Sequence, residues 1–168
     1  MRVGLYFGSF NPIHIGHLII ANHVLNETSL DRIWFMVSPQ NPFKKSVTLL
    51  NEYDRLHLVK VAVEQNNRFR ASDIEFSLPK PSYTVHTLAY LKEKHPTYVF
   101  SIIMGSDSYQ NLPQWHNSIV ITENYDLIVY QRPGFEITKV IPTLLVLEAP
   151  LLEISATHIR KQIREGKS

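Results

Sequence analysis

The chain has 168 residues, with 17 Lys and Arg against 15 Asp and Glu, and no cysteine. Without cysteine it cannot form disulfides, Cys-based zinc sites or a thiol nucleophile, and the net charge of only +2 argues against nonspecific binding to nucleic acid or membranes. We therefore expect small-molecule partners. The length fits one domain over residues 1–168, and the lack of a signal-peptide layout or a membrane-length apolar run predicts a cytoplasmic location.

The first predicted unit is a strand followed by a helix. The apolar run over residues 3–7 is typical of a buried parallel strand, and Gly8 and Ser9 then permit a tight turn. Pro12 prevents a helix from running through this turn. The next apolar-periodic segment, residues 16–24, predicts a helix whose unpaired amides point back toward the strand's carboxyl end, where a phosphate would sit.

Two histidines stand at the entrance of this helix. His14 and His17 are three residues apart, so both imidazoles can face one anion at the positive end of the helix dipole. The arrangement suits a triphosphate. The pair could also be two unrelated packing histidines, and zinc is disfavoured because the chain has neither cysteine nor an H-E-x-x-H motif.

The rest of the chain alternates between the two kinds of element. We expect strands over residues 32–37, 69–74, 98–104, 127–130 and 144–147. We expect a loop over residues 38–46 and helices over residues 51–65, 82–94, 114–119 and 157–164, with Asn51 capping the first of these helices. This alternation predicts a Rossmann-like α/β fold, in which helices cover both faces of a parallel sheet and ligands bind at the carboxyl ends of its strands.

The last expected helix begins in the run ISATHIR, residues 154–160. A helix amino terminus with Ser155 and Thr157, followed by the guanidinium of Arg160, is a second candidate phosphate site. The alternative is ordinary capping by Ser155, with Arg160 in solvent.

The first unit resembles the G-x-F-[DN]-P-x-H-x-G-H signature of the nucleotidyltransferase superfamily, and ISATHIR resembles its second signature, I-S-S-T-x-[IV]-R. Ala156 replaces one serine of that signature. This resemblance implies adenylyl transfer, with His14, His17 and Arg160 in the catalytic role. The ATP-binding set that it implies is Gly8, Ser9, Phe10, His14, Gly16, His17, Gly105, Asp107, Ser155, Thr157 and Arg160.

The middle of the chain resembles one family more closely, the bacterial nicotinate-nucleotide adenylyltransferases. Residues 82–88 resemble its S-Y-T-[VI]-D-T-L motif, with His86 at the usual aspartate position, residues 105–115 its G-[AS]-D…L…W segment, and residues 132–134 its R-P-G element. The resemblance implies that Trp115 stacks on a pyridine ring and that Tyr83 and Thr84 recognise its carboxylate. A core tryptophan and a plain helix start are the alternatives.

Further roles follow from the same resemblance. Asp107 would accept hydrogen bonds from ribose hydroxyls, and the substrate-binding set is Lys44, Tyr83, Thr84, Trp115 and Arg132, in which Lys44 and Arg132 hold phosphates. The expected reaction joins ATP to nicotinate mononucleotide, giving deamido-NAD and pyrophosphate. Mg²⁺ would enter with ATP and be held mainly through phosphate oxygens. A phosphopantetheine-type adenylyltransferase and a nonenzymatic nucleotide-binding regulatory domain remain alternatives, and a homo-oligomer is left open.

Overall fold

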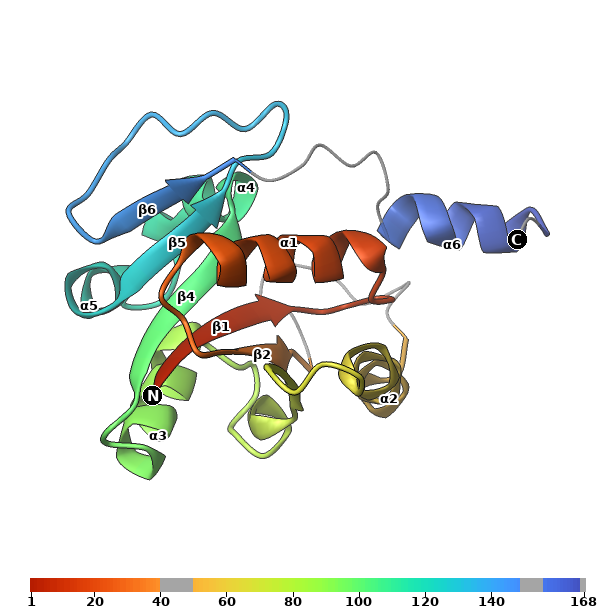
Figure 1. The fold of residues 1–168 in the computed structure, drawn as a ribbon, viewed down its shortest axis with the longest axis horizontal. Coiled ribbons are helices and arrows are strands. Elements are labelled where there is room, and N and C mark those ends of the chain that lie inside the picture. Colours follow the sequence, from red (N-terminus) through yellow and green to blue (C-terminus); the bar gives the residue numbers. More distant parts are fainter. Residues whose placement is uncertain (40–49, 149–155, 167–168) are drawn as a thin grey trace.

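The computed structural model describes residues 1–39, 50–148 and 156–166 and is built on one parallel sheet (Figure 1). Its six strands lie in the order β3-β2-β1-β4-β5-β6. They are β1 (Arg2–Gly8), β2 (Arg32–Val37), β3 (Phe69–Ser72), β4 (Val99–Gly105), β5 (Asp126–Tyr130) and β6 (Leu144–Leu147), and every neighbouring pair is parallel. The predicted Rossmann-like α/β fold is confirmed.

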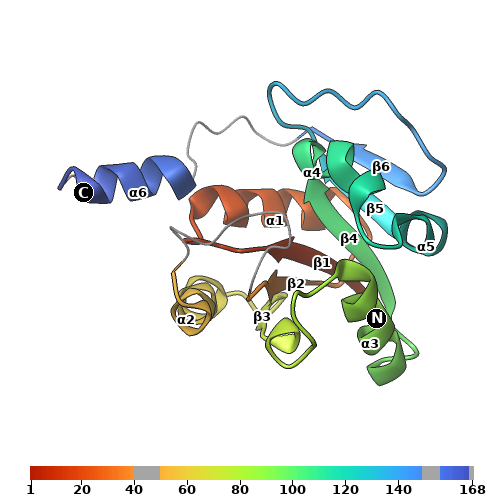
Figure 2. The same ribbon diagram turned by 180° about the vertical axis from the view of Figure 1, so that it is seen from behind.

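Helices cover both faces of this sheet (Figures 1 and 2). The helices are α1 (Ile15–Glu27), α2 (Glu52–Val63), α3 (Thr84–Lys94), α4 (Ser106–Asn111), α5 (Ser118–Asn124) and α6 (Ala156–Arg164), with short 3₁₀ turns η1 (Ile74–Phe76) and η2 (Leu112–Gln114). Helices α1 and α2 share one hydrophobic cluster with the sheet, whereas α3, α4 and α5 pack on the other.

Strand alternation explains why both faces need a cover. Along β2, Ile33 and Phe35 belong to the cluster under α1 and α2, while Trp34 and Met36 belong to the opposite cluster. All four side chains are buried. A strand that is apolar on both faces is stable only at the centre of a helix-covered sheet, and this is why RIWFMV reads as a continuous apolar run.

The strand order reverses direction at β1, which pairs with β2 on one side and with β4 on the other. In open parallel sheets this reversal leaves a crevice outside the carboxyl ends of the two central strands. The turns that follow Gly8 and Gly105 therefore stand at the position where this fold class binds ligands.

Three predictions of secondary structure differ from the structure. The helix expected over residues 114–119 is displaced, because Asn117 adopts a left-handed φ of 51° that separates η2 from α5, which begins at Ser118. Helix α4, with the polar sequence SDSYQN, was not predicted. The strand expected over residues 69–74 ends at Ser72, where the chain turns into η1.

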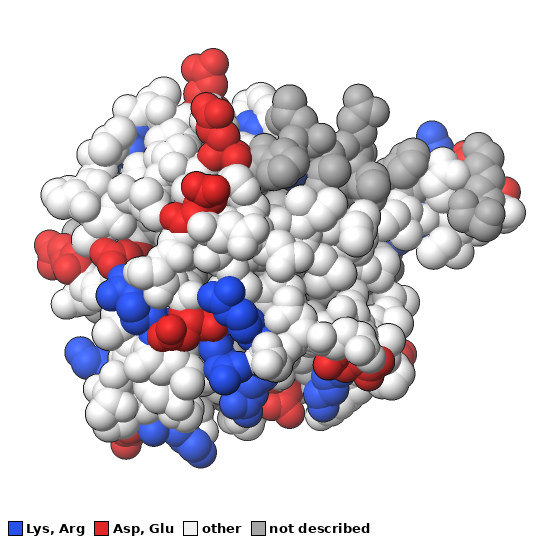
Figure 3. Space-filling model, viewed as in Figure 1, with Lys and Arg blue, Asp and Glu red and all other residues white. Residues whose placement is uncertain are grey.

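Charged side chains of both signs occur on one face of the molecule (Figure 3). On the face seen in Figure 3, acidic and basic side chains lie interspersed. Helix α1 carries a single charged residue, Glu27. In the described part of the chain, no helix is long and apolar enough to cross a membrane.

Candidate functional site

The start of α1 is built by the two predicted histidines. His14 is the N-cap residue, and its Nδ1 accepts a hydrogen bond of 3.1 Å from the Gly16 amide. The Nδ1 atom of His17 accepts a hydrogen bond of 3.1 Å from the His14 amide. These two bonds form a reciprocal capping box, so the side chains that cap the helix are the same ones that the sequence assigned to phosphate.

This cap decides which ring nitrogen carries the proton. Because both Nδ1 atoms accept amide protons, each neutral imidazole must carry its own proton on Nε2. The ring centroids of His14 and His17 are 3.9 Å apart. The cap thus leaves two Nε2–H donors at one helix amino terminus.

Burial keeps these rings neutral. Desolvation, with the nearby His14 and Arg132, lowers the pKa of His17 to about 3, and desolvation with Arg132 lowers the pKa of His14. Neutral imidazoles keep their capping bonds, because an imidazolium has no acceptor atom to offer an amide.

Aromatic rings pack against His17 of this pair. The Phe10 ring lies edge-on to His17 with centroids 5.1 Å apart, and Tyr6 lies edge-on to Phe10 at 5.6 Å. Phe10 reaches this place through a positive φ of 48°. A Cβ atom on Gly8 would come within 3.2 Å of the Phe10 ring, so glycine lets the ring fold under the turn.

The ends of β4 and β5 contribute a second polar group. Asp107 Oδ2 accepts a bond of 3.0 Å from Arg132 Nη1, and Ser106 Oγ accepts a bond of 2.8 Å from the Arg132 amide. A Cβ atom on Gly105 would lie 2.5 Å from Asp107 Oδ1 and 2.9 Å from Arg132 Cδ. Glycine at the strand end therefore leaves room for the pair in this position.

The C-terminal motif lies beside the first one. Arg160 Nη1 donates to the carbonyl oxygen of Asn11, and its Nη2 donates to Thr157 Oγ1 at 3.2 Å. In both ribbon views α6 begins beside the first turn of α1 (Figures 1 and 2). Two of the predicted residues, Lys44 and Ser155, lie outside the described residues.

The predicted mononucleotide residues form a separate group. Tyr83 is the N-cap residue of α3, but its side chain makes no capping bond. Its ring lies against His116, with centroids 4.8 Å apart, and His86 lies edge-on to both rings. Trp115, next to His116, is half-buried against the cluster under α3. The structure thus places the amino end of α3 beside the turn that carries Trp115 and His116.

Two buried charged residues near the site were missed by the sequence analysis. Arg55 is fully buried in α2, and Glu75 is buried in η1. Arg55 shares a helical stripe with Val59 and Val63, and that spacing was the available signal. Tyr53, in the first turn of the same helix, is 64% exposed.

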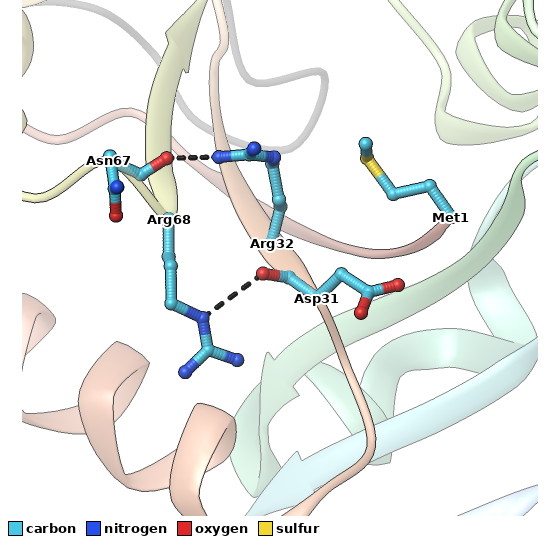
Figure 4. A pocket seen from close by; sticks show the side chains of 5 residues that line it. All are labelled: Met1, Asp31, Arg32, Asn67 and Arg68. Carbon is cyan, nitrogen blue, oxygen red and sulfur yellow. Dashed lines mark hydrogen bonds between the residues drawn. The ribbon is translucent and has the colours of Figure 1, made fainter.

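One cavity lies away from all of these residues. It measures about 520 Å³ and is lined at the amino ends of the strands by Met1, Asp31, Arg32, Asn67 and Arg68 (Figure 4). Arg32 donates to the Asn67 carbonyl, and Arg68 donates to the carbonyls of Asp31 and Leu30. Because these guanidinium groups are already engaged in joining the loop before β2 to the loop before β3, we place the candidate site at the carboxyl ends instead.

Comparison with known proteins gives a consistent result. The cytidylyltransferase-like family model matches residues 5–162. A Flavobacterium johnsoniae protein named "Probable nicotinate-nucleotide adenylyltransferase" is 51% identical over 172 residues, covering 100% of this chain and 89% of its own length. A Cytophaga hutchinsonii protein of the same name is also 51% identical, covering 100% of this chain and 88% of its own length.

The fold is shared with solved structures at lower sequence identity. The Plasmodium falciparum nicotinic acid mononucleotide adenylyltransferase complexed with NaAD matches with a TM-score of 0.85 at 22% identity, covering 99% of this chain and 86% of that one. A Vibrio parahaemolyticus structure, titled as a putative nicotinate-nucleotide adenylyltransferase, matches with a TM-score of 0.70 at 20% identity, covering 99% of this chain and 83% of that one.

Proposed function

The chain belongs to the cytidylyltransferase-like family and, within it, to the nicotinate-nucleotide adenylyltransferases, and we propose that it transfers the adenylyl group of ATP to nicotinate mononucleotide. The products are deamido-NAD, in a step of NAD biosynthesis, and pyrophosphate. The substrates are small-molecule nucleotides. The single observation that carries this proposal is the histidine capping box at the carboxyl end of β1, which presents two neutral Nε2–H donors at a helix amino terminus.

The reaction needs positioning more than it needs a nucleophilic side chain. An oxygen of the mononucleotide phosphate, already ionised at neutral pH, forms a bond to the α-phosphorus of ATP. The bond from this phosphorus to the bridging oxygen breaks, and pyrophosphate leaves with the electron pair. Negative charge grows on the α-phosphate oxygens and on the leaving group, where donors from His14 and His17 stabilise it.

The leaving pyrophosphate would lie between α1 and α6. Arg160 and Thr157 stand where α6 meets the first motif, so a guanidinium and a hydroxyl face the same anion as the histidines. Lys44 and Ser155 complete this set in the proposal. Mg²⁺ would be held by phosphate oxygens and water, since no group of three His, Asp or Glu ligands occurs in the part of the chain that the structure describes.

The mononucleotide would lie between the carboxyl end of β4 and the amino end of α3. Trp115 would stack on the pyridine ring, and the start of α3 at Tyr83 and Thr84 would receive the nicotinate carboxylate, because unpaired amides at a helix amino terminus bind anions. Asp107 and Arg132, which form an ion pair, would bind ribose and phosphate. We further propose that residues 1–168 act as one nucleotidyltransferase domain in the cytoplasm.

The test is a product assay with paired substrates. Purified protein is incubated with ATP, Mg²⁺ and either nicotinate or nicotinamide mononucleotide, and pyrophosphate and dinucleotide are both quantified. We expect equal amounts of pyrophosphate and deamido-NAD, with a clear preference for nicotinate. Pyrophosphate release without a dinucleotide product, or activity with phosphopantetheine instead, would overturn the proposal.

A further inference from the structure

A buried arginine joins three separate turns near the carboxyl edge of the sheet. The Arg55 side chain is fully buried and donates four hydrogen bonds, all to backbone carbonyls. Its Nε atom donates to Leu50 at 2.9 Å, its Nη1 donates to Ser9 at 2.6 Å and to Ser38 at 2.7 Å, and its Nη2 donates to Pro39 at 3.2 Å. Arg55 thus ties the turn after β1 to the end of β2 and to the start of α2.

A buried carboxylate does the same for the neighbouring region. Glu75 is 3% exposed and accepts hydrogen bonds from three hydroxyl groups. The donors are Ser38 at 3.0 Å, Ser82 at 3.4 Å and Thr87 at 2.7 Å. Ser82 and Thr87 flank Tyr83 and Thr84, so Glu75 holds the start of α3 on both sides.

Ser38 is shared by the two groups. Its carbonyl oxygen accepts from Arg55 and its hydroxyl donates to Glu75. Its amide also donates to the Gly8 carbonyl at 3.0 Å. A continuous chain of hydrogen bonds therefore runs from the turn at Ser9, through these three residues, to the start of α3.

Within the described residues neither charged group forms an ion pair, although the Glu52 carboxylate acts on Arg55 electrostatically from beyond ion-pair distance. The ion pairs in that part of the chain are Lys80–Glu52 and Arg132–Asp107, and neither includes Arg55 or Glu75. A buried charge that depends on hydrogen bonds becomes costly when one of them is lost. The turns that supply these bonds are therefore linked, so that ordering one of them restrains the others.

We propose that Arg55, Ser38 and Glu75 are positioning residues that couple the ATP turn to the mononucleotide turn, so that each substrate binds more tightly when the other is present. This inference rests on the proposed function, because it assigns ATP to the turn after β1 and the mononucleotide to the start of α3. A substrate that orders one turn restrains the other through the chain of hydrogen bonds. The second substrate then binds to a turn that is already ordered, so its binding carries a smaller entropy cost.

The test compares two serine variants of the full chain. Ser38→Ala removes the hydroxyl that reaches Glu75 but keeps the carbonyl that accepts from Arg55. Ser77→Ala is the matched control, because the hydroxyl of the exposed Ser77 in the same region donates to the Ile74 carbonyl and takes no part in the chain of hydrogen bonds described above. For each protein, the Kd of nicotinate mononucleotide is measured by calorimetry, alone and with a saturating ATP analogue whose bridge between the α- and β-phosphates cannot be cleaved.

We expect the analogue to tighten mononucleotide binding by about fivefold or more in the wild type and in Ser77→Ala. In Ser38→Ala the ratio of the two Kd values should fall below about twofold, and Ser38→Thr, which keeps the hydroxyl, should restore it. A melting curve of each variant identifies general unfolding, which Ser38→Thr would not repair selectively.

The two proposals fail in different ways. If the wild type forms deamido-NAD but Ser38→Ala keeps the full coupling, the positioning role is wrong and the proposed function stands. Equal Kd values with and without the analogue in the wild type would have the same meaning. If the wild type forms no dinucleotide, both proposals are overturned.

Discussion

The two ends of the parallel strands, called here the amino edge and the carboxyl edge of the sheet, use their nitrogen-bearing side chains differently. At the amino ends, Arg32 and Arg68 border a cavity, yet each donates to backbone carbonyls of a neighbouring loop, Arg32 to Asn67 and Arg68 to Asp31. At the carboxyl ends a helix begins with His14 and His17 as its cap. The contrast teaches that helix starts and strand ends, rather than cavity volume, indicate where this fold can hold an anion.

The largest expected effect is at the histidine cap. His17→Ala should lower kcat by about 100- to 1000-fold while the Kd of nicotinate mononucleotide changes much less, because the imidazole acts on charge that grows at the α-phosphate. His23→Ala, on the same helix but away from its start, is the control and should stay within about twofold. If the His17→Ala protein is folded and has a normal kcat, the histidine cap is no evidence that the anion binds at the carboxyl ends of the strands.

The next effect concerns the ring that faces the mononucleotide. Trp115→Ala should raise the KM of nicotinate mononucleotide by about 5- to 100-fold, as expected for the loss of one stacking contact, while the KM of ATP stays nearly constant. Trp115→Phe keeps a smaller ring and should lie between the two. If both KM values rise together, the half-buried Trp115 serves the core under α3 rather than the substrate.

Arg160 tests whether α6 belongs to the carboxyl-edge site. Arg160→Lys should lower kcat by about tenfold, because an ammonium group cannot keep the bonds to Asn11 and Thr157 while also facing phosphate. Arg164→Lys, one turn later in α6, is the matched control. Steady-state kinetics and a thermal melt on the same preparation check this. An unchanged kcat would mean that Arg160 has only a structural role, through its bonds to Asn11 and Thr157.

The neutral state of the cap should appear in stability as well as in activity. Between pH 6.5 and about 3, the unfolded chain binds a proton at His17 that the folded chain does not. The contribution of neutral His17 to the free energy of unfolding should therefore be fully present above pH 6.5. It should fall by up to about 1.4 kcal/mol per pH unit as the pH decreases from 6.5 to about 3.

Denaturant titrations across this range, compared with His17→Gln, measure that contribution. Glutamine can still accept the His14 amide bond but does not titrate, so the variant should show a shallower decline in stability. Parallel curves for the two proteins would contradict the assignment.

The smallest effect is expected at the opposite edge. Arg68→Ala should leave kcat and both KM values within about twofold and lower stability by about 1 kcal/mol, since its guanidinium only holds the carbonyls of Leu30 and Asp31. A large loss of activity would place a substrate in the cavity of Figure 4 and reverse the comparison between the two edges.

Local patterns predicted most of the fold. The strands β2 and β6 begin and end where their apolar runs do, at Arg32–Val37 and Leu144–Leu147. Helix α4 could not be found in this way, because SDSYQN carries no apolar period and forms only against the end of β4.

Candidate site residues could be named where polar groups follow the end of a strand, as at His14 and Asp107. Buried charged residues were missed. Arg55 and Glu75 look like solvent-facing residues in a one-letter code, because their partners are carbonyls and hydroxyls supplied by turns elsewhere in the chain. Helical spacing with the buried valines of α2 was a signal for Arg55, whereas for Glu75 only the assembled turns show that the carboxyl group lies in the interior.

The histidine cap has a consequence for protein engineering. Its two bonds lie wholly within residues 14–17, so the cap itself forms from a short local segment, whereas the turn before it is held by Arg55 and Arg160. A graft of residues 14–17 onto the start of another helix that follows a parallel strand should therefore bring the cap and its pair of donors together. In such a graft, helix content measured by circular dichroism would report whether the cap had formed.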